Sequence, residues 1–314
     1  MEFSDVLSVS VIIPTKNRPD DLQLAVRSLF EQTRLAQQLI IVDQSESPES
    51  FQRIQKEYAE LPAQVRNVLT LEYIRDSSIP GGAVARNRAM DVAQGQVLLF
   101  LDDDVRLEPD FVAELLAVYN RITAAGGVSG IITNYKRPRW LYRAWTALFL
   151  RGPFHDDRQP IYWRADAHRS HGPIAVTRLG GGLMSFRATA IDGLRFDENL
   201  RGVSDGEDVD FCMRLRPGTL LLVAPRARLL HNQSPRGRAT DHFLRREARS
   251  FYYLYWRNWD RGIKNRLCFA LLNLGFGLLA TLAGLRRGSL EPWRALRAAI
   301  KDAKGVRRKQ GRRP

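Results

Sequence analysis

The sequence predicts an α/β protein built on a doubly wound sheet, on the basis of three observations. Four short apolar segments rich in β-branched residues recur within the first hundred residues. Between them, apolar residues follow the spacing of amphipathic helices. The chain has 314 residues, 44% of them hydrophobic, which suffices for one large domain with an appendage or for two domains. Strands that alternate with helices pair in parallel, so ligands are expected where the strands end.

Each predicted element has a local reason. The first strand is expected at residues 8–15, a run of apolar and β-branched residues. A helix is expected within residues 17–33, because Pro19, Asp20 and Asp21 suit a first helical turn, which tolerates a missing N–H and favours negative charge. Three further strands of the same apolar character are expected at residues 38–43, 68–74 and 96–101.

Three adjacent aspartates, Asp102, Asp103 and Asp104, follow the fourth predicted strand directly. Neighbouring carboxylates repel one another unless a cation or protons neutralise them. Alternate side chains at a strand end can point to the same side, so Asp102 and Asp104 can converge. Mg²⁺ and Mn²⁺ prefer such oxygen ligands and often complete their coordination with substrate phosphate. The cluster therefore indicates a divalent cation site.

Two other interpretations of this cluster stay open at this point. The aspartates can form a solvated acidic turn before a helix that begins near Pro109 and Asp110. They can also suggest a phosphohydrolase motif of the D-x-D-x-[TV] type. That motif fits poorly, because Arg106 occupies the Thr/Val position and the cluster follows the fourth strand rather than the first.

Charge is distributed unevenly along the chain. The net charge is +14, and 18 of the 48 Lys and Arg residues but only 5 of the 34 Asp and Glu residues lie after residue 240. The earlier part is nearly neutral, which argues against a general nucleic-acid-binding protein. A basic tail needs an anionic partner: phospholipid headgroups, nucleic acid or a phosphorylated substrate. Two cysteines, Cys212 and Cys268, favour a reducing compartment over a disulfide framework, and residues 1–9 do not resemble a secretory signal.

The C-terminal region predicts membrane association. Residues 267–285 carry no charge and approach the ~20 residues that span a bilayer, but basic residues flank both ends, so an in-plane or re-entrant helix competes with a span. In residues 291–309, Trp293, Leu296 and Ile300 share one face and basic residues occupy others, which is typical of a helix at an anionic surface. The aromatic and basic residues of segment 139–154 suit either a helix packed across the sheet or a lipid-facing surface.

Seven stretches of the sequence together resemble the family-2 glycosyltransferases. In the family's order, they are residues 9–33, 40–47, 79–90, 98–111, 180–190, 205–215 and 229–234. The resemblance covers roughly residues 8–235. It implies the GT-A fold, a mixed sheet flanked by helices, and transfer of a sugar with inversion at the anomeric carbon.

The resemblance also implies a set of nucleotide-binding residues. Pro14 and Thr15 are expected to line the nucleotide pocket, and Asp43 to accept a hydrogen bond from the base. Arg86 is expected beside the ribose and the diphosphate. Asp103 is placed in the same donor-binding set.

Metal and catalytic roles follow from the same resemblance. Asp102 and Asp104 match the D-x-D pair, the first near ribose and metal and the second on the metal, with His231 near the metal and diphosphate. Asp208 matches the general base, and Glu207 is its acidic neighbour. These residue types suit the chemistry, because a cation stabilises charge on the departing diphosphate while a carboxylate takes the proton of the attacking hydroxyl.

Each of these residues also has a simpler structural explanation. Asp205, Glu207 and Asp208 suit an acidic helix start, and His231 after an apolar run can be a packed histidine. The triplet Gly180 to Gly182 can serve a tight turn or let backbone approach an acceptor. His168 and His171 have metal-like spacing, but no cysteine or further histidine supports a metal site there, so they are expected in a loop.

Two features limit the resemblance. Lys16 stands where an aromatic residue is common in the family, which leaves the nucleobase open. A processive synthase is disfavoured, because the sequence has no Q-x-x-R-W motif and no set of several membrane spans.

The sequence therefore predicts a metal-dependent inverting glycosyltransferase that uses Mn²⁺ or Mg²⁺ and a UDP- or dTDP-linked sugar. The acceptor is expected to be a glycan or lipid-linked hydroxyl in cell-surface polysaccharide or glycolipid assembly. Residues 1–240 are assigned to catalysis, with 1–110 binding the donor and 111–240 the acceptor. Residues 241–314 are assigned to the cytoplasmic face of the plasma membrane, peripherally or monotopically. The alternatives are a nucleotidyltransferase, or a membrane- or nucleic-acid-binding protein with an inactive transferase-like domain.

Overall fold

The structure is a computed structural model that describes residues 7–163, 172–200, 206–232, 243–260 and 262–310. Its chain divides into two compact units. Unit 1 comprises residues 1–136, 157–203 and 207–236, and unit 2 comprises residues 137–156, 204–206 and 237–314. The predicted boundary at residue 240 and the division of the catalytic part stay predictions. His168, His171, Asp205 and the last four residues lie outside the described part.

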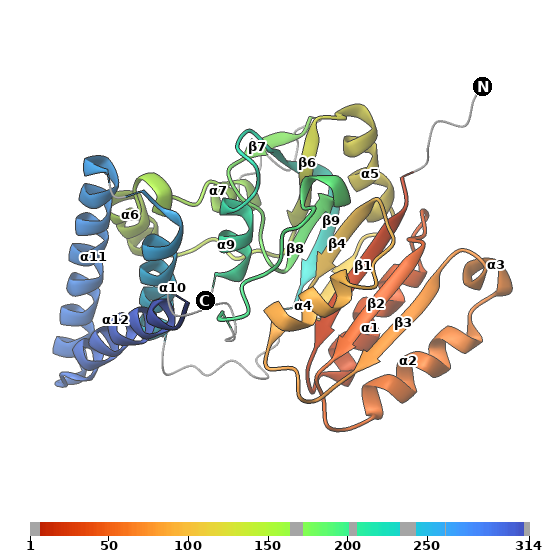
Figure 1. Cartoon of the computed structure of the whole chain (residues 1–314), viewed down its shortest axis with the longest axis horizontal. Helices are drawn as coiled ribbons and strands as arrows, with labels where there is room; N and C mark the ends of the chain where they lie inside the picture. Colours follow the sequence, from red (N-terminus) through yellow and green to blue (C-terminus); the bar gives the residue numbers. More distant parts are fainter. Residues whose placement is uncertain (1–6, 164–171, 201–205, 233–242, 261, 311–314) are drawn as a thin grey trace. The chain divides into compact units, whose positions relative to one another are not determined.

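Unit 1 contains the sheet, whose strands run in the order β3-β2-β1-β4-β8-β6-β9-β5, with β7 paired to β9 (Figure 1). The strands are β1 (Val9–Thr15), β2 (Gln38–Asp43), β3 (Thr70–Arg75), β4 (Val97–Leu101), β5 (Val105–Leu107), β6 (Ala125–Ile132), β7 (Ile174–Val176), β8 (Leu183–Arg187) and β9 (Leu220–His231). The first four pair in parallel, as predicted. Antiparallel pairing of β8 with β4 and β6 makes the sheet mixed, which confirms the predicted fold class.

Helices cover the sheet and connect its strands. Those of unit 1 are α1 (Pro19–Phe30), α2 (Glu49–Glu60), α3 (Ala63–Arg66), α4 (Gly82–Met90), α5 (Phe111–Arg121), α7 (Arg158–Trp163) and α9 (Glu207–Met213), with a 3-10 turn η2 (Ala188–Ala190). The start of α1 is as predicted, with Pro19 in its first turn followed by Asp20 and Asp21. It ends three residues before the predicted limit, at Phe30.

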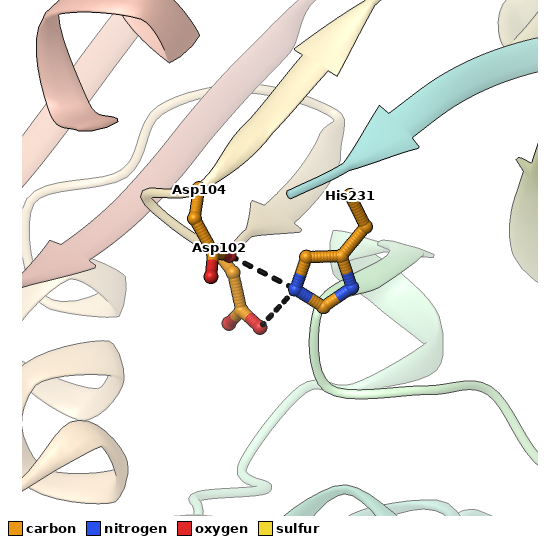
Figure 2. Close-up of side chains that lie close together, drawn as sticks. All are labelled: Asp102, Asp104 and His231. Atoms are coloured by element: carbon orange, nitrogen blue, oxygen red, sulfur yellow. Dashed lines mark ion pairs between the residues drawn. The ribbon is translucent and has the colours of Figure 1, made fainter. Parts of the chain in front are cut away.

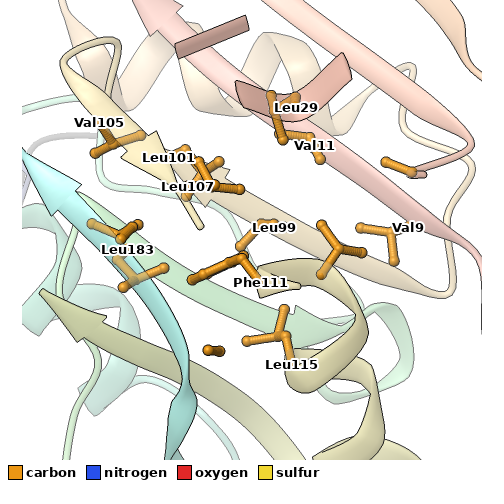
Figure 3. Close-up of a cluster of buried hydrophobic side chains, with 14 of the residues drawn as sticks. Val9, Val11, Leu29, Leu99, Leu101, Val105, Leu107, Phe111, Leu115 and Leu183 are labelled. Atoms are coloured by element: carbon orange, nitrogen blue, oxygen red, sulfur yellow. The ribbon is translucent and has the colours of Figure 1, made fainter. Parts of the chain in front are cut away.

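The hydrophobic core has two parts, because successive strand residues point to opposite faces of the sheet. On one face, Val11 and Leu99 pack with Leu29 of α1 and Phe111 of α5 (Figure 3). On the other face, Ile12, Phe100 and neighbouring strand residues pack with α4 and α9. Burial on both faces explains why β1, β2 and β4 are continuous apolar runs rather than alternating patterns.

Unit 2 is entirely helical in its described residues. It contains α6 (Trp140–Phe149), the 3-10 turn η1 (Gly152–Phe154), α10 (Phe243–Asn258), α11 (Ile263–Arg287) and α12 (Glu291–Gln310). Aromatic rings join these elements, with Tyr255 of α10 stacked on Phe269 of α11 at 3.9 Å between centroids. Segment 139–154 thus contributes a helix that packs on α11 within this unit, through Trp145 against Phe276.

The amphipathic segment after residue 290 uses its apolar face inside unit 2. Leu296, Ala299 and Ala303 of α12 are buried, and α12 packs chiefly on α10. The Arg245–Asp302 ion pair joins the same two helices. Of the three apolar residues expected at the membrane, Leu296 is buried, Ile300 is half-buried and Trp293 is exposed, so protein covers part of this face. Of the helices in the described residues, α11 alone has the length and apolar composition of a membrane span, and only 22% of its most apolar window is buried.

Candidate active site

The predicted site begins at the carboxyl ends of three parallel strands. β1 ends at Thr15, β2 at Asp43 and β4 just before Asp102. The register pairs Thr15 with Asp43, so the ends of these strands meet at one edge of the sheet. This is the edge at which open α/β sheets bind ligands.

Asp102, Asp104 and His231 converge at this edge (Figure 2). The His231 Nε2 atom lies 2.9 Å from Asp104 Oδ1 and 3.8 Å from Asp102 Oδ2. The pairing of β5 with β9 brings the histidine there, since it places Val105 opposite His231. A hydrogen bond from the Asn232 N–H to the Asp104 carbonyl, at 2.8 Å, continues this pairing.

These three side chains fit a hard divalent cation. Ligands at ~2.1 Å in an octahedral shell lie ~3 Å from their nearest neighbours around the ion. One ligand atom from each residue can be chosen so that all lie within 4.8 Å of one another. Two carboxylates and an imidazole are also donors that Mn²⁺ and Mg²⁺ accept, with positions left for substrate oxygens.

Asp103 contacts Thr15 and Arg18 rather than His231, and Arg18 also lies 3.7 Å from Asp104. The Asp103 carboxylate accepts a hydrogen bond from the Thr15 hydroxyl at 2.7 Å and pairs with Arg18 at 2.9 Å. Burial raises the pKa of Asp103 to about 6, against the lowering effect of the Arg18 charge and the Thr15 hydrogen bond. The middle aspartate thus ties β4 to the end of β1, while its two neighbours face His231.

Asp43 and Pro14 lie at the same edge, in different environments. Asp43 is fully buried, accepts a hydrogen bond from the Tyr73 hydroxyl at 2.8 Å and caps its own turn by accepting from the Ser45 N–H at 2.9 Å. Burial, followed by the charge of Asp43, raises the pKa of Tyr73. Pro14 is partly exposed. Both oxygens of Asp43 therefore have protein partners.

Arg86 connects the metal-type cluster to the predicted catalytic acids. Its side chain is 5% exposed, and its two Nη atoms lie 3.3 Å from Asp102 and 3.1 Å from Glu207. Arg86 also donates a hydrogen bond to the Gly181 carbonyl at 3.2 Å. A guanidinium presents donors in a rigid fork, so one side chain can join three groups in this way.

Glu207 and Asp208 begin α9 and have separate partners. Asp208 accepts from the Gly181 N–H at 2.9 Å and lies 3.3 Å from Arg158 of α7. Burial raises the pKa of Glu207 to about 7; the Arg86 charge opposes this shift and the Asp208 charge adds to it. Phe211 and Cys212 of the same helix are buried, so an acidic helix start with an inward apolar face is present as well.

The glycine triplet lies between these groups. Gly181 contacts Asp208 through its N–H and Arg86 through its carbonyl. A Cβ at Gly182 would lie 2.7 Å from an Asp102 carboxylate oxygen and 3.5 Å from the His231 ring. A side chain at this position would therefore displace the acidic cluster, which explains the need for glycine.

Three side chains of this region were missed by sequence reasoning. Arg158 pairs with Asp208, Arg18 with Asp103, and Tyr73 with Asp43. Arg18 lies in a stretch used for the family resemblance, so its position gave a signal. Arg158 and Tyr73 have no local pattern that marks them, because their contacts depend on the folding of distant segments.

Comparison with known proteins places the chain in a family. The model of glycosyl transferase family 2 matches residues 10–186, more than half of the chain. The chain is 26% identical over 248 residues to the succinoglycan biosynthesis protein ExoM of Rhizobium meliloti, covering 77% of this chain and 72% of that one. It is 29% identical over 170 residues to galactofuranosyltransferase GlfT2 of Mycobacterium tuberculosis, covering 52% of this chain but only 25% of the relative.

Solved structures agree on the fold. The chain matches S. aureus TarS with a TM-score of 0.59 and 18% identity, over 96% of this chain and 49% of that one. It matches the mannosyltransferase PcManGT from Pyrobaculum calidifontis, in complex with GDP-Man and Mn²⁺, with a TM-score of 0.56 and 16% identity, over 95% of this chain and 86% of that one. The GT-A fold and the family match both confirm the resemblance seen in the sequence. The chain is thus a glycosyltransferase enzyme and belongs to glycosyl transferase family 2.

Proposed function

We propose that this enzyme is a metal-dependent inverting glycosyltransferase. It moves a sugar from a UDP- or dTDP-linked donor to a hydroxyl group of a glycan or lipid-linked acceptor. The observation that carries the proposal is the convergence of Asp102, Asp104 and His231 next to Arg86, which in turn pairs with Glu207 beside Asp208. Donor-binding and proton-accepting groups of the required types thus lie around a single glycine turn.

Asp102, Asp104 and His231 are the residues that would hold Mn²⁺ or Mg²⁺. When bound there, a divalent cation would stabilise the negative charge that develops on the departing diphosphate. Arg86 supplies a fixed positive charge at the same place, and its nearly complete burial strengthens its interaction with an anion. Pro14, Thr15 and Asp43, at the adjacent strand ends, are assigned to the nucleoside, and Asp103 supports this side of the site through Thr15.

Asp208 is assigned as the general base. It would take the proton of the acceptor hydroxyl as that oxygen attacks the anomeric carbon, a contribution of ~10²- to 10⁴-fold. The Gly181 N–H and Arg158 hold this carboxylate in one orientation. A direct displacement of this kind inverts the anomeric centre.

The donor and the pathway are proposed from similar proteins. Two similar structures contain UDP or UDP-GlcNAc and another contains GDP-Man with Mn²⁺. The names of two relatives refer to succinoglycan and teichuronic acid biosynthesis. Together with the basic helical unit, these names support assembly of a cell-surface polysaccharide or glycolipid at the cytoplasmic face of the plasma membrane.

The structure favours this function over a nucleotidyltransferase. Such an enzyme needs a strongly basic phosphate-binding loop near the first strand. Lys16 and Arg18 are the basic residues available there, and Arg18 is engaged with Asp103.

The experiment that tests the proposal is a donor screen. Purified full-length protein is incubated with Mn²⁺, with Mg²⁺ or with chelator and a panel of sugar nucleotides, and both donor binding and slow donor hydrolysis are measured. We expect at least one UDP- or dTDP-linked sugar to bind and hydrolyse in a metal-dependent way. A lack of binding to every donor in either metal would contradict the proposal.

A further inference from the structure

A continuous apolar stripe runs along the outer face of α11. It consists of Ile263, Leu267, Leu274, Leu278, Leu282 and Leu285, here called the α11 stripe. Leu267 is 66% exposed, Leu274 64% and Leu285 76%. Their spacing of three, four or seven residues keeps these side chains on one side of a helix. The stripe extends nearly the whole length of a 25-residue helix, ~37 Å at 1.5 Å per residue.

The opposite face of α11 is packed against the rest of unit 2. Leu272, Phe276 and Ala280 are buried there. The Tyr252 hydroxyl of α10 donates to Asn273 at 2.7 Å, and the Trp145 Nε1–H of α6 donates to the Gly275 carbonyl at 3.2 Å. α11 therefore has two apolar faces. One packs against protein, and the other is exposed.

Basic side chains lie at both ends of the α11 stripe. Lys264 and Arg266 are exposed at its beginning, and Arg286 and Arg287 at its end. α12 follows after a short turn, and among the residues whose burial is described it exposes Arg294, Arg297, Lys301 and Lys304. An apolar stripe between basic groups complements an anionic membrane surface, where acyl chains lie beneath negatively charged headgroups.

A membrane-spanning arrangement of α11 conflicts with its partners. Asn273 and Gly275 lie near the middle of the helix, so a span would carry Tyr252 and Trp145 to the centre of the hydrocarbon layer. Arg143 lies two residues before Trp145 on α6, and Arg257 lies near Tyr253 on α10. Charged side chains at that depth are costly. A membrane span is oriented by an excess of basic residues at one end, and α11 has basic residues at both ends.

We infer that α11 lies in the plane of an anionic membrane, with the α11 stripe in the acyl region and both helix ends on the same side of the bilayer. The inference rests on the membrane partner in the proposed function and specifies which helix contacts it and in what orientation. Sequence reasoning gave a membrane role to both residues 267–285 and the helix after residue 290, and left the orientation of the first open; the inference chooses the in-plane orientation for α11.

Vesicle flotation tests which surface binds. Full-length protein is mixed with sealed vesicles of phosphatidylcholine, with or without phosphatidylglycerol. We expect the wild type to float with the anionic vesicles, and the double variant Leu274→Glu/Leu278→Glu to bind them about tenfold or more weakly. Val68→Glu, which places one glutamate at an exposed apolar position of unit 1, is the control and should bind as the wild type does.

Cysteine labelling tests the orientation. In a Cys268→Ser background, single cysteines are introduced by Lys264→Cys and Arg287→Cys, at the two ends of α11. Protein bound to the outside of sealed anionic vesicles is then treated with a membrane-impermeant maleimide. We expect both positions to react fully before detergent is added. The background without an added cysteine should stay unlabelled, because Cys212 is buried.

Three results would overturn the inference. Protection of one helix end until detergent is added would indicate a span. Undiminished flotation of the Leu274→Glu/Leu278→Glu variant would remove the stripe from the binding surface. A wild-type dimer in solution that this variant converts to a monomer, without vesicle binding by either, would identify a second copy as the occupant. Donor binding, measured separately, reports on the proposed function independently of all three results.

Discussion

The edge of the sheet in unit 1 and the outer face of α11 in unit 2 are opposite cases. The first buries charged side chains, and the second exposes apolar ones. At the sheet edge, buried charges are compensated by one another, as when Arg86 joins Asp102 to Glu207. On α11, large apolar side chains are exposed and the basic residues are at the margins. The first arrangement suits a charged ligand bound at a partly buried site. The second suits a broad apolar partner such as a membrane, whose acyl region has a low dielectric constant. The comparison teaches that exposure has to be interpreted together with residue type before a surface is assigned a partner.

The largest effect is expected at the proposed base. Asp208→Asn keeps the size of the side chain but cannot accept the acceptor's proton, so kcat should fall by ~10²- to 10⁴-fold while donor binding is retained. Single-turnover transfer and donor titration on the same preparation measure both. Turnover equal to the wild type would assign the base elsewhere.

The second prediction compares adjacent aspartates with different partners. Asp104→Ala should weaken Mn²⁺-dependent donor binding by at least about tenfold, because it removes one ligand of the proposed ion. Asp103→Asn should retain metal-dependent binding and lower the free energy of unfolding instead, since it alters the contacts with Thr15 and Arg18. Calorimetric titration and thermal unfolding separate the two outcomes. If both variants lose metal equally, the division of the triplet into two functions is wrong.

A smaller effect is expected in the pH dependence of stability. Burial raises the pKa of Glu207 to about 7, well above its value in the unfolded chain. The protonated carboxyl therefore contributes stability that is fully present below pH ~4.5 and is lost as the pH rises through 7, up to ~3 kcal/mol. One Glu207 oxygen, Oε2, is buried without a hydrogen-bond partner in the described part of the chain, which is consistent with this cost of ionisation.

Thermal unfolding of metal-free protein between pH 5 and pH 8 measures this effect. The wild type should lose stability relative to Glu207→Gln as the pH rises, because the glutamine cannot ionise. Parallel curves for the two proteins across this range would contradict the assignment of the pH dependence to Glu207.

The smallest effect is expected at Arg158. Arg158→Gln should lower kcat by about tenfold, since Asp208 loses the ion-pair partner that holds its orientation. Arg158→Lys, which keeps the positive charge, should restore much of the lost kcat. If the fall in kcat matches a loss of folded protein measured by thermal unfolding, the role of Arg158 is purely structural.

The sequence predicted those features that depend on local pattern. Strands β1 to β4 were predicted to within two residues at each end, because each is a short apolar run bounded by polar residues. The acidic cluster was identified by its place after the fourth strand. Its geometry depended on more than this, since the histidine reaches it only through the β5–β9 pairing of segments more than a hundred residues apart.

The features that sequence reasoning missed depend on long-range packing. Arg158 approaches Asp208 because α7 and α9 fold beside the glycine turn. The hydrophobic periodicity of the sequence does not predict such a contact. A membrane-binding helix was predicted at α12 because its apolar and basic residues lie on separate faces. Amphipathicity alone does not distinguish a face that contacts lipid from one that packs on another helix, here α10. The packing partner of α12 depends on how the other helices of unit 2 fold, which the sequence pattern does not specify.

Gly181 has a consequence for how the two proposed roles are spaced. Its N–H donates to Asp208 and its carbonyl accepts from Arg86, so the backbone of one residue contacts both the proposed base and the arginine assigned to the diphosphate. The separation of these two side chains therefore depends on the backbone of this turn, and a shift of the turn would displace both of them.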